Sequence, residues 1–477
     1  MSIAPPDSAP AAARDLDALR ARLDAADGGA ELRPLGLGAV LLGRGVLSQV
    51  APAVAELRTG EGPVIMIADR RPMAGPGGEV KTIVAAAITH AGLPLVRVTV
   101  GDTRAETHAD AATIDAATAQ SARACVLVSV GSGTVVDIGK AVSAALGGVP
   151  HVVVQTAASV NGFADDQSVL LREGVKRTTP TRWPDRLLVD TDVIAAAPAE
   201  LNRAGLGDLL ATYTAPADWL LARLVGQDDS YSATVVGLAR AHVDAVLEHA
   251  GAIATGDPDA IDNLTASLTL SGISMGVAGR TAPGSGMEHT VSHLLEMARQ
   301  PGDPDVLHGA QVGALSVLGA MLWTRVRAAA RNGGLENLRF PEPVQLRSRV
   351  LAAFEDLDPS GRMGTECWRD YARKLERWHG AREQLADLPA RWPAFDAELD
   401  GLLADPERLV AALRAADAPV RLSELGIGAD TARWALSNSH LMRDRFTVAD
   451  LAFFMGIWEA AHADALLAQA AALGAGL

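Results

Sequence analysis

Residues 124–146 read ACVLVSVGSGTVVDIGKAVSAAL and combine the two kinds of element that make up the first half of the chain. The run ACVLVSVG is rich in Val and too short for a helix, which is typical of a buried strand. The segment TVVDIGKAVSAAL has the apolar spacing of a helix, and a Gly-Ser-Gly turn joins the two. The stretch therefore predicts a strand, a tight turn and a helix.

The same alternation of strand and helix continues on both sides of this stretch. Further strands are predicted for AVLLG, PVIMIAD, LVRVTV, HVVVQTA and RLLVD, and further helices for SQVAPAVAEL, VKTIVAAAITHAG and ADAATIDAATAQSA. Alternation of this kind favours a parallel sheet with helices on both faces. We therefore expect an α/β domain over residues 36–195.

The remaining segments differ in character. Residues 1–35 are expected to be a Pro/Ala-rich tail followed by a short helix, LDALRARLDAA. Residues 157–185 are expected to be largely irregular. Residues 196–477 show helical periodicity almost throughout, which predicts an all-helical domain with a core of Leu, Ala, Met and Trp. Within this domain, residues 340–425 show no recognisable chemistry, and we interpret them as helical packing, an extra flap or a dimer contact.

Composition excludes several classes of function. The 477 residues carry a net charge of −15 and no long basic run, so nucleic acid is not an expected partner. The chain contains no stretch of eighteen apolar residues, so we expect no membrane span. Only two cysteines are present, Cys125 and Cys367, and neither belongs to a CxxC pair. This favours a reducing, cytoplasmic setting.

A histidine-rich segment marks the helical half. Residues 272–313 contain His289, His293 and His308. The first two are four residues apart and so share one face of a helix, while the third follows the loop PGDPD and begins a new apolar run. Asp208, in AGLGDLLA, offers a carboxylate. One aspartate and two neutral imidazoles can hold a metal and leave positions open for substrate. Alternatively, the histidines cap helices or bond within a core.

The Gly-Ser-Gly turn is a candidate cofactor site. Gly131 and Gly133 would let the backbone approach a pyrophosphate, and the following helix would supply free N–H groups and its positive dipole end. The turn lacks the GxGxxG pattern, so a simple strand-to-helix turn remains an alternative. Asp137 and Lys140 lie one helical turn apart and strengthen the cofactor interpretation, although they would equally suit an exposed ion pair.

Asp69, at the end of the predicted strand PVIMIAD, favours a dinucleotide. A carboxylate in this place can hold the adenosine ribose hydroxyls, which is typical of NAD in a Rossmann-like domain. The adjoining Arg70 and Arg71 could accept a 2′-phosphate. The choice between NAD and NADP therefore stays open.

Five motifs in order give the chain a family resemblance. They are GSGTVVDIGK, TAASVNGFADDQS, APAELNRAGLGDLLA, SGISMGVAGRTAPGSGMEHTVSH and HGAQVG. With them the chain resembles the glycerol-1-phosphate dehydrogenase branch of the iron-containing alcohol dehydrogenase superfamily, which shares a fold relationship with dehydroquinate synthase. The similarity covers roughly residues 36–321. It implies an active site in the cleft between a nucleotide-binding α/β domain and a helical domain.

The resemblance also implies roles for individual residues. Asp208, His289 and His308 would bind one divalent metal per chain; zinc suits this set best, and nickel or iron also bind such ligands. His293 would lie beside the metal and relay a proton or orient the substrate. The positions that match cofactor contacts are Gly131, Ser132, Gly133, Thr134, Thr156 and Ser159.

The reaction implied by the resemblance is hydride transfer. The metal would polarise the carbonyl of a small ketone, and the nicotinamide of NAD(P)H would exchange hydride with the carbonyl carbon. Dihydroxyacetone phosphate and sn-glycerol 1-phosphate are the leading substrate pair. We also expect a homo-oligomer, as most soluble enzymes of this kind are symmetric assemblies.

Two departures from the family pattern fall in the motif TAASVNGFADDQS. Asn161 stands where Asp is usual, and it keeps the hydrogen bonding of a polyol contact but not its charge. Asp165 and Asp166 stand where a small hydroxyl residue is usual. A carboxylate there would repel a pyrophosphate unless Lys176 or Arg177 neutralises it.

A third departure lies before the histidines. The branch commonly reads Ser-Ser-Arg-Pro, whereas this chain reads Arg-Thr-Ala-Pro, so that Arg280 stands two positions early. Arg280 would reach a substrate phosphate or cap a helix end. Lys176 and Arg280 are thus the candidate partners of a substrate phosphate.

Other functions remain open. A sugar-phosphate cyclase related to dehydroquinate synthase would recycle a tightly held NAD, but its lysine- and asparagine-rich substrate motifs are absent from the sequence. A related dehydrogenase with a redirected pocket, or a cofactor-binding regulator that kept the fold, would also suit the three departures. Net consumption of NAD(P)H separates a dehydrogenase from a cyclase.

Overall fold

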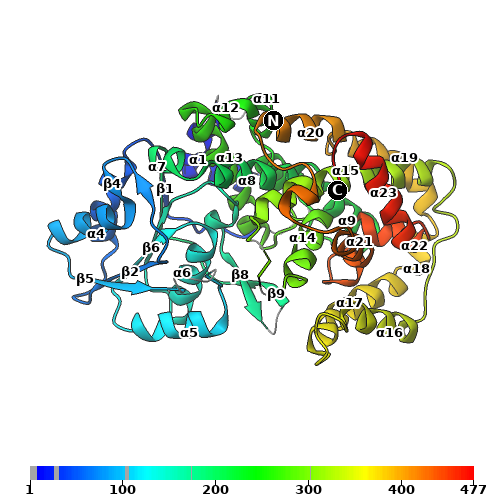
Figure 1. Cartoon of the computed structure of the whole chain (residues 1–477), viewed down its shortest axis with the longest axis horizontal. Coiled ribbons are helices and arrows are strands. Elements are labelled where there is room, and N and C mark those ends of the chain that lie inside the picture. Colours follow the sequence, from blue (N-terminus) through cyan, green and yellow to red (C-terminus); the bar gives the residue numbers. More distant parts are fainter. Residues whose placement is uncertain (1–7, 26–31, 102–106, 173–174, 301, 304) are drawn as a thin grey trace.

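The computed structural model describes residues 8–25, 32–101, 107–172, 175–300, 302–303 and 305–477. Strands with their covering helices occupy one end of the molecule, and helices occupy the other (Figure 1). The chain therefore has both the α/β part and the helical part that the sequence predicts.

The α/β part is built on a six-stranded parallel sheet. Its strands are β1 (Ala39–Gly43), β2 (Val64–Ala68), β5 (Leu95–Thr99), β6 (Val126–Gly131), β7 (His151–Gln155) and β10 (Arg186–Asp190). They stand in the order β1-β10-β7-β6-β2-β5, and each neighbouring pair is parallel. All six coincide with predicted strands, which confirms the predicted fold class.

Helices cover both faces of this sheet. They are α3 (Val50–Leu57), α4 (Val80–His90), α5 (Ala111–Gln120) and α6 (Gly133–Ala145), with the 3-10 helix η1 (Val46–Gln49) before α3. Val64 and Met66 of β2 pack with α3 and α4, whereas Ile65 and Ile67 pack with α5 and α6. Successive side chains of a strand point to opposite faces, so a strand covered on both sides is apolar throughout.

Residues 157–185 contain regular structure that the sequence does not predict. After η2 (Gly162–Ala164) they form an antiparallel hairpin of β8 (Gln167–Arg172) and β9 (Val175–Pro180). A polar contact helps to hold this hairpin, because the N–H of Val169 donates to the Asp137 carboxylate on α6 at 3.1 Å. Because such a contact does not depend on the spacing of apolar residues, that spacing gives little indication of these two strands. A smaller hairpin, β3 (Ala74–Gly75) with β4 (Gly78–Glu79), precedes α4.

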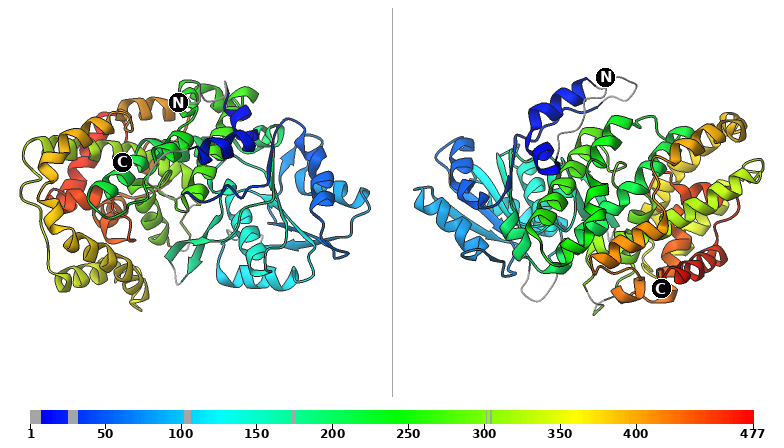
Figure 2. Two further views of the ribbon diagram at one scale, coloured as in Figure 1. Left: turned by 180° about the vertical axis from the view of Figure 1, so that it is seen from behind. Right: turned by 90° about the horizontal axis from the view of Figure 1, so that it is seen from above.

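The expected N-terminal tail is partly helical. Residues 9–14 form α1 (Ala9–Arg14), and the predicted short helix follows as α2 (Leu16–Asp24). Ala9, Ala12 and Ala13 are buried where α1 packs on α13 (Pro258–Ala278). Figure 2 shows both N-terminal helices lying against the rest of the molecule. Small side chains let α1 approach its neighbour closely, so an alanine-rich segment here forms an interface.

Beyond β10 the described elements are helices. The first group is α7 (Thr191–Ala196), α8 (Ala199–Leu210), η3 (Ala211–Tyr213), α9 (Ala215–Leu224), α10 (Ala233–Ala239), α11 (Val243–Glu248), α12 (Ala250–Ala254), α13, α14 (Met287–Met297) and α15 (His308–Arg331). The second is α16 (Pro343–Phe354), α17 (Arg362–Gly380), α18 (Arg382–Leu385), α19 (Leu388–Leu399), α20 (Pro406–Ala415), η4 (Leu422–Leu425), α21 (Ala429–Asn438), η5 (Ser439–Leu441), α22 (Val448–Phe454) and α23 (Ala460–Ala472).

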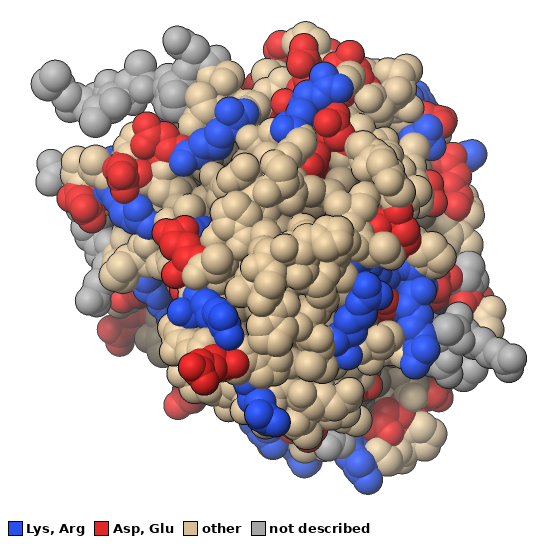
Figure 3. All heavy atoms as spheres, turned by 90° about the vertical axis from the view of Figure 1, so that its left-hand side faces the viewer, with Lys and Arg blue, Asp and Glu red and all other residues tan. Residues whose placement is uncertain are grey.

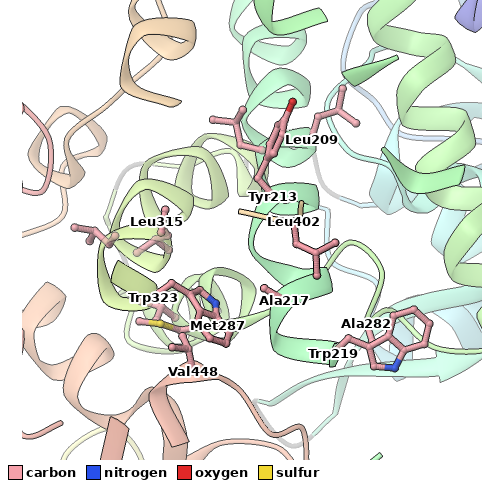
Figure 4. Close-up of a cluster of buried hydrophobic side chains, with 14 of the residues drawn as sticks. Leu209, Tyr213, Ala217, Trp219, Ala282, Met287, Leu315, Trp323, Leu402 and Val448 are labelled. Atoms are coloured by element: carbon pink, nitrogen blue, oxygen red, sulfur yellow. The ribbon is translucent and has the colours of Figure 1, made fainter. Parts of the chain in front are cut away.

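One continuous hydrophobic core joins both groups of helices. Leu209 of α8, Trp323 of α15 and Val448 of α22 belong to it, together with Leu402, which follows α19 (Figure 4). Helices α16–α20 are therefore packed into the same core as the helices that carry the histidines. This agrees with the interpretation of residues 340–425 as helical packing.

Charged residues of both signs lie on the surface of the α/β end. Figure 3 shows side chains of both charges interspersed over one face of the α/β end, without a continuous basic patch among the described residues of that face. Among the described helices, none has the length and apolar character needed to cross a membrane.

Glycines bring α8 and α15 into backbone contact. A Cβ added to Gly207 on α8 would lie 2.2 Å from the carbonyl oxygen of Gly309 on α15. A Cβ added to Gly309 would lie 2.1 Å from the carbonyl oxygen of Ala204. Real Cβ atoms do not come so close to backbone oxygens, so any larger residue at either position would push the helices apart. The spacing of these two helices is therefore set by the absence of side chains.

We expect Gly207→Ala to lower the free energy of unfolding by about 1–3 kcal/mol, the usual cost of overpacking. Gly319→Ala on α15 is the matched control, because a Cβ there would lie 3.6 Å from the Thr214 side chain, an ordinary contact. Alanine also favours helix over glycine by about 1 kcal/mol, so this control should be neutral or stabilising. Denaturant unfolding of both variants provides the measurement, and equal stabilities would contradict the packing argument.

Candidate active site

The structure brings the three predicted metal ligands together from three helices. Asp208 lies near the end of α8, His289 in the first turn of α14 and His308 at the first position of α15. One ligand atom from each lies within 4.8 Å of the others. The His289 Nε2 is 3.5 Å from the Asp208 Oδ1. Helix α14 also contacts β9, so the cluster lies beside the hairpin of the α/β part (Figure 1).

The buried carboxylate of Asp208 has one oxygen left for a metal. Its Oδ2 accepts the backbone N–H of Asn161 at 2.9 Å. Its Oδ1 is buried and receives no hydrogen bond from the described residues. A buried carboxylate oxygen without a donor is costly unless a cation compensates it. The donor set of one carboxylate and two imidazoles therefore fits a divalent metal.

Both ligand histidines have their Nδ1 occupied. The Nδ1 of His289 is bonded to the Glu288 carboxylate at 3.0 Å, and that of His308 lies 3.1 Å from the Ser292 hydroxyl and 3.2 Å from the Glu296 carboxylate. These contacts leave Nε2 of each ring for a metal, and a carboxylate behind a ligand histidine raises its basicity. Glu288 and Glu296 are not among the predicted site residues, although Glu288 is the first residue of the EHTVSH motif and Glu296 follows the motif by three residues.

The electrostatics of the site also favour a cation. Burial disfavours the charged ring of His289, but Asp208 and Glu288 outweigh burial and raise its pKa to about 9. Burial likewise opposes ionisation of Glu296, yet Lys176 and His308 outweigh it and lower its pKa to about 2. Carboxylates thus lie next to the rings of both His289 and His308, which favours a cation between these rings and Asp208.

His293 lies beside the three ligands rather than among them. Its ring stacks on that of His308 with centroids 5.4 Å apart, and its Nδ1 accepts a hydrogen bond from Arg443 at 2.7 Å. Burial and then the charge of Arg443 hold the pKa of His293 well below its ordinary value, so the ring is neutral. His293, Glu296 and His308 also lie within metal-binding distance of one another. The Glu296 carboxylate is already paired with Lys176 at 2.7 Å, which favours the Asp208 set.

The predicted cofactor turn lies at a topological switch point of the sheet. From β2 the chain crosses to β5 on one side, whereas from β6 it crosses to β7 on the other. A crevice between the carboxyl ends of two such strands is where open α/β sheets bind ligands. Asp69 follows β2 and Gly131 ends β6. The structure therefore places these two predicted cofactor residues at the carboxyl ends of the two neighbouring strands that flank the switch point.

The start of α6 is open to an anion. Ser132 is the N-cap residue, but its side chain makes no capping bond within the described part of the chain. A Cβ on Gly131 would lie 2.6 Å from Val135, which explains why glycine is needed in this turn. The exposed Thr134 lies in the first turn of the helix. Free N–H groups at a helix start bind phosphate well.

The other predicted cofactor residues line the same region. Thr156 follows β7, and its N–H donates to the carbonyl of Gly131 at 3.1 Å. Ser159 is buried further along the same segment. The Asp69 carboxylate is bonded to Lys81 at 2.6 Å, so a ribose would share it with an ammonium group. Their cofactor contacts stay predictions.

Asp137, Lys140 and Asp165 form a buried ionic cluster, in contrast to the exposed pair that was one expectation. The Lys140 ammonium is fully buried and lies 3.2 Å from the Asp137 carboxylate and 2.7 Å from the Asp165 carboxylate. It also donates to the carbonyls of Gly162 and Gln167. Lys140, and neither Lys176 nor Arg177, therefore neutralises Asp165. The cluster holds the β8–β9 hairpin against α6, and direct cofactor contact by its members stays a prediction.

The predicted substrate residues lie in different surroundings. The side chain of Asn161 donates to the Ser271 hydroxyl at 3.1 Å, close to Asp208. Lys176 is part of the histidine cluster through Glu296. Arg280 is instead paired with Asp228 at 2.5 Å. Both residues line a cavity of about 220 Å³, and among the described residues that line this cavity there is none of the three clustered histidines.

Comparison with known proteins identifies the family. Residues 41–198 match the family model for iron-containing alcohol dehydrogenases. The chain is 31% identical to the glycerol-1-phosphate dehydrogenase [NAD(P)+] of Bacillus subtilis over 324 residues, which is 68% of each chain. The chain belongs to the glycerol-1-phosphate dehydrogenase branch of the iron-containing alcohol dehydrogenase family. A third match comes from an archaeal member, the glycerol-1-phosphate dehydrogenase [NAD(P)+] of Methanothrix thermoacetophila, at 31% identity over 66% of this chain and 87% of the relative.

Solved structures show the same fold. This chain superimposes on a probable glycerol dehydrogenase from Sinorhizobium meliloti with a TM-score of 0.56, at 17% identity, over 92% of this chain and 98% of that one. Glycerol dehydrogenase from Schizosaccharomyces pombe gives the same TM-score at 16% identity, over 94% of each chain. Membership of the family confirms the resemblance and the oxidoreductase class predicted from the sequence.

We expect metal binding at this site to strengthen with pH. A metal that binds Nε2 of His289 must displace a proton, because the pKa of the metal-free ring is raised to about 9. The apparent zinc affinity should therefore rise about tenfold per pH unit from pH 7 to 8.5 and level off above pH 9. Competition against a chelator of known pH dependence provides the measurement. Glu288→Gln, which removes one charge that raises this pKa, should shift the plateau to lower pH.

Proposed function

We propose that the chain is a metal-dependent NAD(P)H oxidoreductase that interconverts a small ketone and a secondary alcohol. The leading pair is dihydroxyacetone phosphate and sn-glycerol 1-phosphate. The observation that carries the proposal is the convergence of Asp208, His289 and His308 within 4.8 Å, with the Asp208 Oδ1 left without a hydrogen bond from the described residues. The names of the relatives, which specify glycerol-1-phosphate and NAD(P), support the substrate and the cofactor.

Asp208, His289 and His308 would hold the divalent metal, with Glu288 and Glu296 fixing the two rings. When bound, the metal would supply Lewis-acid polarisation of the substrate carbonyl and the nicotinamide would supply hydride. Zinc suits the ligands, and iron or nickel also accept them. The start of α6 would bind the pyrophosphate, and the crevice between β2 and β6 would direct the nicotinamide end toward the histidines.

His293 and Asn161 would act on the substrate. Arg443 donates to the Nδ1 of His293, so the neutral ring carries its proton on Nε2. That proton is available to the oxygen that becomes the alcohol. The Asn161 side chain is held by Ser271 next to Asp208, where an amide can orient a substrate hydroxyl.

The proposal also includes the cellular location, the assembly and the choice of cofactor. A reducing cytoplasm suits the two cysteines, which are both buried and free. A homo-oligomer is expected on general grounds. Arg70 and Arg71 are exposed beside Asp69, so both NAD and NADP belong in the test.

The test is oxidation of NADH and NADPH by chelated protein to which zinc, nickel or iron is added back. We expect metal-dependent oxidation with dihydroxyacetone phosphate, and a loss of kcat/KM of at least about a hundredfold in the double variant Asp208→Ala, His308→Ala, because a metal supplies several kcal/mol of charge stabilisation. The variant His249→Ala, which removes an exposed histidine, serves as the control.

The outcomes separate the candidate functions. If the double variant still binds one metal per chain and keeps full turnover, the assignment of Asp208 and His308 as metal ligands is wrong. Turnover of a sugar phosphate without net consumption of NAD(P)H would point to a cyclase. Bound metal and cofactor with no oxidation of any ketone would point to a regulator.

A further inference from the structure

Arg443 reaches the histidine cluster from a distant part of the sequence. It lies between η5 and α22 and donates to the Nδ1 of His293 at 2.7 Å and to the carbonyl of Lys176 at 3.0 Å. A third, longer contact of 3.4 Å joins it to the Thr178 hydroxyl. These contacts connect the C-terminal helices to β9 and α14. They place a guanidinium group beside the ring that stacks on His308.

Arg443 forms no ion pair with the described residues, although the charges of Asp370 and Asp444 oppose part of the effect of burial on its pKa. All three of its acceptors are neutral groups, and no carboxylate of the described chain lies within ion-pair distance. Its Nε is buried and has no hydrogen-bond partner among the described residues. Burial, and then the charges of Arg445 and Arg177, lower the pKa of Arg443 to about 10, so it is still cationic at pH 7. A partly buried cation without a counter-ion is unfavourable until an anion arrives.

Two other basic residues near the cluster are already neutralised, whereas Arg445 bonds, among the described residues, only to neutral groups of Ser285 and Thr281. Lys176 is paired with Glu296 at 2.7 Å, and Arg177 is paired with Asp370 and with Glu366. The same holds for Arg280, which is paired with Asp228 away from the histidines. The two residues that the sequence offered as phosphate partners, Lys176 and Arg280, therefore both have carboxylate partners, whereas Arg443 does not.

The backbone holds Arg443 in this place against a local preference. Its φ of 65° lies in the left-handed region, which a non-glycine residue seldom adopts. Arg445 anchors the segment, because it donates to the hydroxyls of Ser285 and Thr281 and to the carbonyl of Ser285. Asp218 adds a second anchor by accepting the N–H groups of Met287 and Val448. Strain that the surroundings maintain next to a reactive site is commonly functional.

We propose that Arg443 is the residue that binds the phosphate of the substrate and so determines the preference for a phosphorylated ketone. The proposal rests on the proposed function, since it places the substrate carbonyl at the Asp208, His289 and His308 cluster. A phosphate monoester is the anion that suits a guanidinium group best. Binding it would give Arg443 the counter-charge that the protein lacks.

The test compares dihydroxyacetone phosphate with dihydroxyacetone in Arg443→Gln and Arg443→Gly. The glycine variant accepts φ > 0 without strain, so it keeps the test valid if the glutamine variant does not fold. In both we expect KM for the phosphorylated ketone to rise by at least about thirtyfold, as for loss of a buried charged partner, while KM for dihydroxyacetone changes by less than about threefold. Arg373→Gln is the matched loss of one charge and should leave the ratio unchanged, because this exposed arginine is paired with Asp370 at 2.6 Å, lies 3.6 Å from Asp444 and does not contact His293.

A second measurement is independent of turnover. Inorganic phosphate should bind the metal-loaded wild-type protein at least about tenfold more tightly than it binds either Arg443 variant, as measured by calorimetry. An equal loss with both ketones, or equal phosphate affinities, would overturn the proposal and leave Arg443 as a residue that only positions His293. If the wild type reduces neither ketone but the phosphate affinities differ as expected, the proposed function fails and the anion site stands.

Discussion

The close approach of α8 and α15 is the constraint on which the rest of this structure depends. Asp208 and His308 come from different helices, and their separation is fixed by the backbones that meet at Gly207 and Gly309. A metal tolerates deviations in ligand distance of only about 0.2 Å, so helices held apart by even one methyl group would not present both ligands. The third proposed ligand, His289, lies on α14, whose start is tied to α22 through Asp218. The packing of the large helical core therefore fixes the positions of the residues in this small polar cluster.

The α/β part and the helical part share one apolar core, in which Val153 and Val189 of the sheet lie with Leu206 of α8. Polar contacts add to this core, because Lys176 on β9 is paired with Glu296 on α14. Within the α/β part, Lys140 joins α6 to the loop before β8. Because such polar contacts have fixed geometry, they help to orient the carboxyl ends of the strands relative to the histidines. A fully buried ammonium such as that of Lys140 is tolerated only with its partners in place, so the position of the β8–β9 hairpin depends on these specific residues as well as on buried area.

The sequence predicts the regular elements of this fold well because each is encoded locally. The central strands β2, β6 and β7 are buried and largely apolar, and the glycine turn and the HxxxH spacing are short patterns that can be recognised without knowledge of the fold. The β8–β9 hairpin escapes prediction since polar contacts such as that of Val169 with Asp137 hold it. Glu288 lies in the predicted EHTVSH motif and Glu296 follows it, yet their partners become evident only in three dimensions. Arg443 is beyond sequence reasoning, because nothing near it in the chain indicates that it meets His293.

The hydrogen bond between Asn161 and Asp208 bears on how such a site can change during evolution. The carboxylate of Asp208 is supported by the backbone N–H of Asn161, not by its side chain. Every residue except proline supplies that N–H, so a mutation at this position leaves the metal support in place. The side chain, which faces Ser271, is then free to vary with the substrate. The replacement of the Asp expected from the family resemblance by Asn is a change of this kind. Under the proposed function, position 161 is therefore a natural starting point for altering substrate choice while the proposed metal ligand Asp208 keeps its support.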